Sequence, residues 1–233
     1  MNHAPATRPQ ALAPLREDGA PVVIAQLGQS LDGRIATVTG ASKYINGARA
    51  LEHLHRLRAH VDAVIVGVGT VAADDPRLTV RRVDGRHPAR VVIDPRGRMP
   101  RDAAILADGT APVLVASAPD APPPPPPAEA LRLPAPGGRF DPRAIVAALA
   151  ERGLTRLLVE GGADTLAGFL EARAVDMLHI LMSPMILGSG KPGFRLSPIE
   201  RLDEALRPRT EVHVFDDGDV LFTCDMRNSW SRP

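Results

Sequence analysis

A short apolar run that leads directly into glycines is the feature that most constrains the fold of this chain. Residues 63–66 have the continuous hydrophobicity of a strand that is buried on both faces. Gly67-Val68-Gly69-Thr70 follows, and then a polar cluster at residues 74–81. Glycine lets backbone N–H groups approach a phosphate, and the polar side chains behind it can orient a second molecule. The segment therefore predicts a nucleotide-binding loop after a buried strand.

Further apolar runs alternate with helix-like segments. We expect strands at residues 22–27, 63–66, 90–93, 112–116 and 156–159, and helices at 47–60, from 141–142 to about 152, and from the glycines at 161–162 to about 173. The last part of the chain predicts strands at 177–182, 211–215 and 220–224, with a hairpin connection at 216–219. This order predicts an α/β fold whose sheet is parallel at first and mixed later.

Composition narrows the class of protein. The 233 residues suffice for one domain with a sizeable core, and a net charge of +1 with only 3% aromatic residues argues against a nucleic-acid partner. The sequence contains no apolar run of about 18 residues, so we expect no membrane partner. Cys224 is the only cysteine, which excludes an internal disulfide and favours a cytoplasmic protein.

The ends and loops are also predicted. Residues 1–20 are rich in alanine, proline and charge, which predicts a disordered tail before a single domain at 21–228. The prolines at 122–127 predict a stiff surface loop near residues 119–128. The histidines, including His53 and His55, lack the spacing of metal ligands, so no metal site is expected. We expect Cys224 to be a buried strand residue.

Two glycine segments, at 67–70 and 160–162, follow predicted buried strands. The first can be interpreted as a Rossmann fingerprint, with Ala72 in place of the third glycine and Asp94 as the acid that binds a ribose. That interpretation assigns no role to Asp74, Asp75, Pro76 and Arg81. The glycines could also serve tight turns alone.

Five blocks point to one enzyme family. They are Ser30-Leu31-Asp32-Gly33-Arg34, Ser42-Lys43-Tyr44-Ile45, Leu57-Arg58-Ala59, residues 69–81 and Val159-Glu160-Gly161-Gly162. In this order they resemble the reductase domain of the bifunctional riboflavin-biosynthesis deaminase/reductase, over residues 22–226. The resemblance implies a dihydrofolate-reductase-like three-layer fold with a mostly parallel, mixed central sheet, NADPH as cofactor and a homodimer. It displaces the Rossmann interpretation.

The resemblance also implies a reaction. The family reduces the ribosyl group of 5-amino-6-(5-phosphoribosylamino)uracil to a ribityl chain, by hydride transfer from NADPH to C1′ of the opened ribosylamine. The chain has one cysteine and no Pro-Cys-x-x-Cys, so it lacks the zinc site of the deaminase and resembles a stand-alone reductase.

Site residues follow from the same resemblance. The expected substrate-binding residues are Ser42, Arg58, Leu78, Arg81 and Glu160. The expected cofactor-binding residues are Gly28, Tyr44, Thr70, Asp74, Gly161, Gly162, Ala163, Asp164, Thr165 and Leu166. Arg58 and Arg81 have the fork geometry that binds a phosphate bidentately. Glycines at the start of a helix leave N–H groups free for the cofactor pyrophosphate.

Some roles stay open at this point. Asp32 and Glu160 are the candidate catalytic acids, with Asp74 or water as alternatives for protonating the nitrogen. Arg96 and Arg98 are the candidates for binding the 2′-phosphate of NADPH. The alternative functions are reduction of 2,5-diamino-6-ribosylamino-pyrimidinone phosphate, or of another pteridine-like compound, and nucleotide binding without catalysis.

Overall fold

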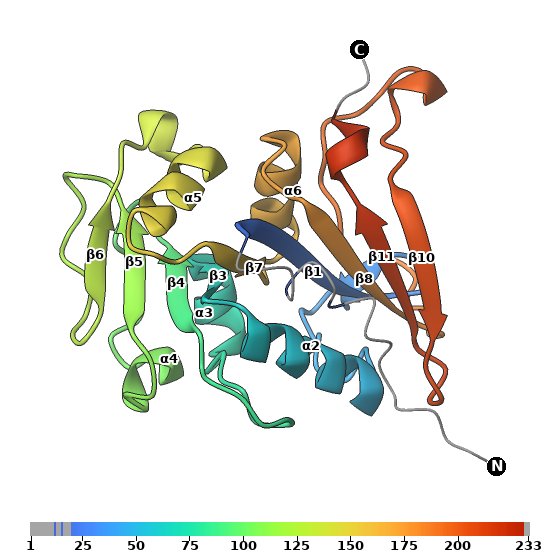
Figure 1. Ribbon diagram of the computed structural model, residues 1–233, viewed down its shortest axis with the longest axis horizontal. Coiled ribbons are helices and arrows are strands. Elements are labelled where there is room, and N and C mark those ends of the chain that lie inside the picture. The colour runs from blue at the N-terminus through green and yellow to red at the C-terminus, as the bar shows by residue number, and fades with distance from the viewer. Residues whose placement is uncertain (1–11, 13–14, 16–19, 231–233) are drawn as a thin grey trace.

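The computed structural model describes Leu12, Leu15 and residues 20–230 of the chain. A central nine-stranded sheet has helices on both faces (Figure 1). The strand order is β10-β11-β8-β1-β7-β3-β4-β5-β6, and all pairs are parallel except β11 with β8 and β10 with β11. The predicted α/β fold with a mostly parallel, mixed sheet is therefore confirmed.

The sheet consists of β1 (Val22–Ser30), β3 (Ala63–Gly67), β4 (Ala89–Ile93), β5 (Val113–Ser117), β6 (Glu129–Arg132), β7 (Arg156–Val159), β8 (Met177–Ser183), β10 (Arg209–Val214) and β11 (Val220–Asp225). A second, two-stranded sheet pairs β2 (Arg34–Ala36) with β9 (Lys191–Pro192). The helices are α2 (Ala48–His60), α3 (Val68–Asp74), α4 (Ala104–Ala107), α5 (Pro142–Ala150) and α6 (Ala163–Glu171). Short 3₁₀ turns lie at Pro136–Gly138, Leu202–Glu204 and Arg227–Ser229.

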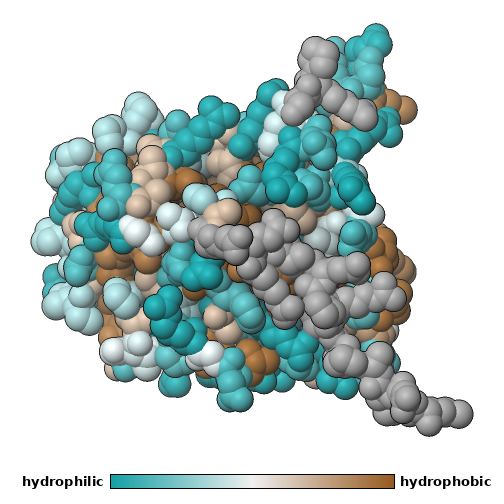
Figure 2. Space-filling model, viewed as in Figure 1, coloured by the Kyte–Doolittle hydropathy of each residue, from teal (hydrophilic) through white to brown (hydrophobic). Residues whose placement is uncertain are grey.

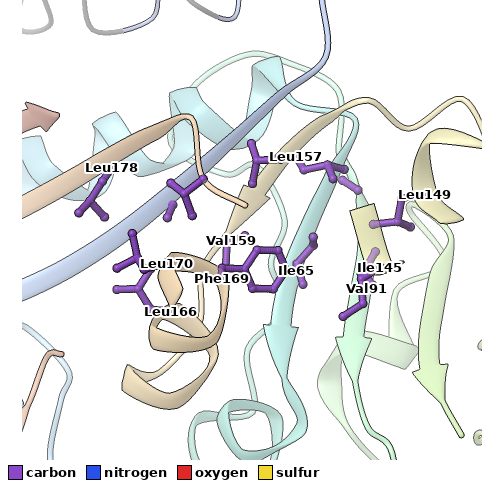
Figure 3. Packing of buried hydrophobic residues seen from close by; sticks show 14 of the residues in the cluster. Ile65, Val91, Ile145, Leu149, Leu157, Val159, Leu166, Phe169, Leu170 and Leu178 are labelled. Atoms are coloured by element: carbon purple, nitrogen blue, oxygen red, sulfur yellow. The ribbon is translucent and has the colours of Figure 1, made fainter. Parts of the chain in front are cut away.

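Alternating side chains of the central strands enter two separate cores. In β1, Ile24 packs in the core that includes Leu57 of α2, while Ala25 packs in the core that includes Phe169 of α6. Figure 3 shows the second core, where Ile145 of α5 and Phe169 lie against the sheet. Because both faces are covered, these strands need apolar residues at consecutive positions, as the sequence predicted.

Helix boundaries have local causes. Asp141 caps α5 by accepting the N–H of Arg143 at 2.9 Å, and Pro142 occupies the first turn. Gly162 is the N-cap of α6 and has no side-chain cap. Both predicted helices begin where expected, but they end at Ala150 and Glu171, about two residues early.

Several elements differ from the prediction. Residues 67–70 do not form a glycine loop: Gly67 is the N-cap of α3, and the following residues are its first turn. The short elements α4, β2, β6 and β9 were not predicted. The strand β1 continues to Ser30, beyond the predicted end at residue 27, because its pairing with β8 extends to the register pair of Ser30 with Ser183.

The remaining predictions concern the tail and single residues. The predicted tail at 1–20 falls almost wholly outside the described residues, but Leu12 and Leu15 are buried in the core beside α2. The proline run connects β5 to β6 and most of it is exposed. Cys224 is buried as predicted, and burial raises the pKa of its thiol. Across the described part of the chain, no helix is long and apolar enough to cross a membrane.

The topology places a site at one edge of the sheet. The parallel strands β8, β1, β7, β3 and β4 are neighbours, so their carboxyl ends lie along the same edge. In chain order, β3 follows β1, and the later strand β7 inserts between them in the sheet. The next strand, β8, pairs with the other side of β1. Ligands of open α/β sheets bind beyond such strand ends. A ligand site is therefore expected in the segments that follow β1, β7 and β3.

A pair of buried histidines joins α2 to β8. Nε2 of His53 lies 3.0 Å from Nδ1 of His179, and the two rings stack with centroids 5.2 Å apart. Among the described residues, the other nitrogen of each ring has no hydrogen-bond partner. Burial lowers the pKa of both rings, that of His179 to about 4. Both imidazoles are therefore neutral in the folded protein at neutral pH.

This pair predicts a loss of stability in mild acid. Between the ordinary histidine pKa of 6.5 and the folded value of about 4 for His179, the unfolded chain binds protons that the folded pair does not. Stability should therefore be full above that window and fall as the pH falls through it, by on the order of 3 kcal/mol. Urea unfolding of wild type and of His53→Leu/His179→Leu at several pH values measures this, and the double variant should show a flatter pH dependence. The control His60→Asn should keep the wild-type slope, and equal slopes in all three proteins would contradict the prediction.

Candidate active site

A pocket of about 510 Å³ lies between α2 and the carboxyl-terminal half of β1. Its lining comes from β1, β8, α2, the end of α3 and the loop at residues 42–46. Four residues that the sequence analysis assigned to substrate or cofactor line it: Gly28, Ser42, Tyr44 and Asp74. The fold therefore brings together residues from three separate segments of the chain, namely β1, the loop at 42–46 and the end of α3.

Local geometry accounts for the glycine at position 28 and for the exposure of Tyr44. A Cβ at Gly28 would lie 2.1 Å from Oδ1 of Asn46, whose amide donates to the carbonyl of Leu181 at 3.1 Å. A side chain at position 28 would thus displace the side chain of Asn46, which lines the pocket. Tyr44 is 86% exposed and has a positive φ of 70°, so its ring lies at the surface of this loop.

A buried ion pair lies further along α2, beyond the pocket residue Leu54. Nε of Arg58 lies 2.7 Å from Oε1 of Glu160, and Nη2 lies 2.5 Å from Oε2. The two side chains are 8% and 9% exposed, and Nη1 of Arg58 donates to the carbonyl of Thr79 at 3.2 Å. Arg58 therefore joins the residue after β7 to the segment at residues 78–81, which contains two of the expected substrate-binding residues. Its guanidinium fork, expected to bind phosphate, binds Glu160 in this arrangement.

Arg81 lies beside this ion pair and is exposed. Burial of part of its side chain and the positive charges of Arg58, Arg77 and Arg82 lower the pKa of Arg81. Its Nη1 donates to Oγ1 of Thr79 at 2.6 Å, and no carboxylate in the described residues forms an ion pair with it. A cluster of arginines with one shared acid attracts an anion.

Leu78, the other residue of this segment that the sequence predicted to bind substrate, has a positive φ of 56°. Its side chain is buried in the core beside α2 and α3. Such a conformation is uncommon for leucine and persists only where neighbouring contacts hold it. The segment that carries Arg81 is therefore held in one shape by its surroundings.

The starts of α3 and α6 meet at the ends of β3 and β7. A Cβ at Gly67 would lie 2.6 Å from Oγ1 of Thr165, and one at Gly161 would lie 2.4 Å from Cβ of the same threonine. A Cβ at Gly162 would lie 3.6 Å from Oγ1 of Thr70. These glycines let the two helix starts approach closely, and α6 begins without a side-chain cap. The N-terminus of α6 therefore has uncapped backbone N–H groups, an arrangement that binds anions in proteins.

The first turn of α6 contains the other cofactor residues predicted in this segment. Ala163 is buried at its start, and the exposed Asp164 forms an ion pair with Arg195 at 3.5 Å. The side chain of Leu166 is fully buried in the core, so only its backbone faces the end of the helix. Thr70 lies within α3, whose N-terminus has no side-chain cap.

Asp32 follows β1 and binds a distant loop. Its carboxylate accepts hydrogen bonds from Oγ of Ser30 at 2.6 Å and from the backbone N–H groups of Leu187 and Gly188 at 3.1 and 2.7 Å. The hydrogen bond from Ser30, followed by that from Leu187, lowers the pKa of Asp32 to about 2. The carboxylate is therefore ionised at neutral pH and acts as an acceptor.

The segment after β4 contains Asp94, Arg96 and Arg98. Asp94 is fully buried, and its Oδ2 accepts the N–H of Met99 at 2.8 Å. It cannot reach a ribose, so the Rossmann interpretation of this residue is wrong. Both arginines are exposed in the turn that follows, next along the edge from β3 and β7. Within the described residues, no group of three or more acids, histidines or cysteines could hold a metal ion.

Sequence reasoning missed Asn46, His55 and His87. Nδ1 of His55 accepts the N–H of Arg81 at 2.9 Å, and Nδ1 of His87 accepts the N–H of Val80 at 3.0 Å. The only signal in the sequence was the position of His55 three residues before Arg58 on the same helix, because such residues share a face.

Comparison with known proteins identifies the family. Residues 21–218 match the family described as the RibD C-terminal domain. The chain belongs to the RibD C-terminal domain family. The resemblance found in the sequence is therefore confirmed.

Individual relatives of this RibD C-terminal domain are similar over most of its length. The 2,5-diamino-6-ribosylamino-4(3H)-pyrimidinone 5′-phosphate reductase of Methanothermobacter thermautotrophicus is 38% identical over 190 residues, which are 79% of this chain and 87% of that protein. The riboflavin biosynthesis protein RibD of Aquifex aeolicus is 34% identical over 210 residues, 87% of this chain but 57% of that protein. The chain thus spans little more than half of the RibD protein.

Two solved structures have a similar fold. The deaminase and 5-amino-6-(5-phosphoribosylamino)uracil reductase of Thermotoga maritima superposes with a TM-score of 0.75 at 28% identity, over 93% of this chain and 60% of that one. The yeast riboflavin biosynthesis reductase Rib7 superposes with a TM-score of 0.71 at 22% identity, which shows the shared fold. This RibD C-terminal domain therefore has the architecture of the reductase part of its relatives.

Proposed function

We propose that the protein reduces the ribosyl group of 5-amino-6-(5-phosphoribosylamino)uracil to the ribityl product with NADPH, as a step of riboflavin biosynthesis. The observation that carries the proposal is the placement of the assigned residues: Gly28, Ser42 and Asp74 line one pocket, and α2, which also lines that pocket, carries Arg58 in its buried ion pair with Glu160. Membership of the RibD C-terminal domain family and relatives named as reductases support it.

The cofactor cradle is formed by the starts of α3 and α6. Gly162 leaves space at the N-terminus of α6, whose free N–H groups and dipole stabilise a pyrophosphate, and Gly161 lets Thr165 pack against the backbone after β7. A bound nicotinamide cofactor supplies the hydride for the reaction. Tyr44, Thr70 and Asp74 complete the wall of this half of the site in our proposal, with Gly28 giving the space in which the reacting groups meet.

The substrate half is assembled around the buried ion pair. Arg81 binds the phosphate, and the charge of Arg58 favours the same anion while its fork holds Glu160 in place. Glu160 and Ser42 orient the pyrimidine and sugar hydroxyls, and buried Leu78 shapes the wall. Asp32, ionised and bound to the loop at 187–188, positions that loop and donates no proton.

A second substrate is supported by a specific observation. The stand-alone reductases of M. thermautotrophicus and Archaeoglobus fulgidus, 38% and 34% identical, are named for 2,5-diamino-6-ribosylamino-4(3H)-pyrimidinone 5′-phosphate, and this chain spans 87% and 82% of them. The two substrates differ at one ring position, where an amine donates hydrogen bonds and a carbonyl accepts them. The reaction at the sugar is the same for both.

Turnover assays separate these functions. Purified protein is mixed with NADPH and each pyrimidine phosphate, and the loss of NADPH absorbance is followed. Turnover of the uracil compound supports the first proposal, and turnover of the diaminopyrimidinone alone supports the second. NADPH binding without turnover of either would support the alternative of nucleotide binding without catalysis.

Arg96 and Arg98 are proposed to bind the 2′-phosphate of NADPH. Charge-assisted hydrogen bonds to a phosphate are strong, so Arg96→Ala/Arg98→Ala should raise the KM for NADPH by roughly tenfold or more and leave that for NADH unchanged. Steady-state kinetics with both cofactors measures the ratio. The exposed Arg143 of α5 provides a control, because Arg143→Ala should change neither value. An equal loss with both cofactors would place the 2′-phosphate elsewhere.

We also propose a cytoplasmic homodimer. β10 is an edge strand with Val212 and Val214 57% and 64% exposed, and Figure 2 shows apolar surface at the edge of the molecule where β10 lies in Figure 1. Val212 is paired with Phe222 of β11, which is paired in turn with Ile180 of β8, so one apolar row continues across three strands. An uncovered apolar sheet edge of this kind favours self-association. Light scattering measures the mass in solution.

A further inference from the structure

Two histidines accept consecutive backbone N–H groups in the segment that carries Arg81. Nδ1 of His55, on α2, accepts the N–H of Arg81 at 2.9 Å, and Nδ1 of His87 accepts the N–H of Val80 at 3.0 Å. His55 is 4% exposed, so this hydrogen bond is shielded from water. Neither ring is a metal ligand or a member of the pocket lining.

His55 can accept this hydrogen bond in only one protonation state. A histidine Nδ1 can accept only in the neutral ring, with its proton on Nε2. Burial and then the charges of Arg58, Arg81 and Arg82 lower the pKa of His55 to about 4. The arginine cluster that attracts an anion therefore also keeps His55 in the form that accepts the N–H of Arg81.

Three side chains hold the backbone just after Leu78, whose left-handed φ of 56° needs such support. Arg58 binds the carbonyl of Thr79, His87 binds Val80, and His55 binds Arg81. Arg58 and His55 are three residues apart on α2 and so lie on one face of the helix. The backbone at Arg81 is thus attached to the same helix that carries Arg58 and lines the pocket.

We propose that His55 is a positioning residue, which holds the backbone of Arg81 so that its guanidinium faces the 5′-phosphate of the substrate, with His87 fixing the residue before it. This inference rests on the proposed function, because it takes a sugar phosphate as the ligand of Arg81. His55 does not touch the reacting atoms and acts through Arg81.

The test compares an acceptor with an apolar residue at position 55. In asparagine, Oδ1 takes the place of Nδ1, whereas leucine fills the space without an acceptor. His55→Leu should weaken the binding of ribose 5-phosphate in calorimetry by about fivefold, and His55→Asn should restore most of it. In turnover, the KM for the phosphorylated pyrimidine should rise with kcat nearly unchanged, and the KM for its dephosphorylated form should not change.

Two controls test whether His55 affects phosphate binding through Arg81. In an Arg81→Ala background, His55→Leu should cause no further loss of ribose 5-phosphate binding. His60→Asn alters a histidine on the same helix whose Nδ1 bonds the carbonyl of Arg56 instead, and it should bind like wild type. An undiminished loss in the Arg81→Ala background, or equal losses for phosphorylated and dephosphorylated ligands, would overturn the inference.

NMR of the wild-type protein tests the inference without any variant that could fail to fold. The ring of His55 should be the neutral tautomer with its proton on Nε2, and the amide of Arg81 should be protected from hydrogen exchange. A proton on Nδ1 or an unprotected amide would overturn the inference. Ribose 5-phosphate binding and NMR require no turnover. A protein that reduces neither pyrimidine would therefore refute the proposed function, while the role of His55 could still be tested by these two measurements.

Discussion

Replacing Arg58 with methionine should lower the free energy of unfolding by about 3–5 kcal/mol and reduce turnover at least a hundredfold. The substitution leaves the carboxylate of Glu160 buried without its partner, at 9% exposure, and unpaired buried charges are strongly destabilising. It also releases the carbonyl of Thr79, and with it the segment that carries Arg81. Urea unfolding and steady-state kinetics on the same preparation measure both effects.

A double variant separates folding from catalysis. Arg58→Met/Glu160→Gln removes both charges and should regain much of the lost stability, because neutral groups are far less costly to bury than an unpaired ion. Its turnover should stay low. Recovery of activity together with stability would show that the ion pair only supports the fold.

The ion pair of Arg156 with Asp62 is a matched control. Arg156 begins β7, and Glu160 follows the other end of the same strand; Nη2 of Arg156 lies 2.7 Å from Oδ1 of Asp62. Arg156→Met should lower stability but leave turnover unchanged. A loss of turnover as large as that of Arg58→Met would mean that loss of stability alone explains the result.

Changing Gly162 to alanine should weaken NADPH binding by about tenfold or more and change the free energy of unfolding by less than about 1 kcal/mol. Gly162 has φ −65° and ψ 174°, a conformation that alanine adopts, and the new Cβ would meet Oγ1 of Thr70 at an ordinary 3.6 Å. The protein can therefore accept the methyl group. The space that the methyl group fills lies at the start of α6, where we place the pyrophosphate.

Fluorescence titration with NADPH and thermal unfolding measure the two quantities. Asp141→Ala serves as the control, because it removes the cap of the neighbouring helix α5. It should cost about 1 kcal/mol of stability and leave the NADPH Kd unchanged. Unchanged NADPH binding in Gly162→Ala would move the cofactor away from this helix.

Much of the fold could be predicted because its causes are local. The helix at residues 48–60 and the strand at 63–67 follow from the spacing and continuity of their apolar side chains. The helix α3 could not be predicted in the same way, because Gly67 and Gly69 disfavour a helix. Val68 and Val71 are buried against the sheet, and this packing outweighs the low propensity.

The candidate site, too, could be predicted only where its features are local to a segment of the sequence. Its residue types and their order were visible in the sequence, so Gly28, Ser42, Tyr44 and Asp74 could be named, and they line one pocket. Their grouping depends on strand order, because β7 inserts between β1 and β3. The roles of the charged residues depend on partners that are distant in sequence. Arg58 and Glu160 are 102 residues apart, and Asp32 binds a loop 155 residues away.

The sequence by itself determined the family, the alternation of strands and helices, and the glycines at which a cofactor can approach the backbone. The family follows from the resemblance of five ordered blocks of residues, whereas the other two follow from side-chain size, periodicity and backbone freedom, which each segment carries with it. The tertiary structure alone decided which charges are paired and which are free, since burial and distance exist only after the strands assemble. That is why Arg58 is paired with Glu160, while Arg81, whose backbone N–H donates to His55, has no ion-pair partner among the described residues.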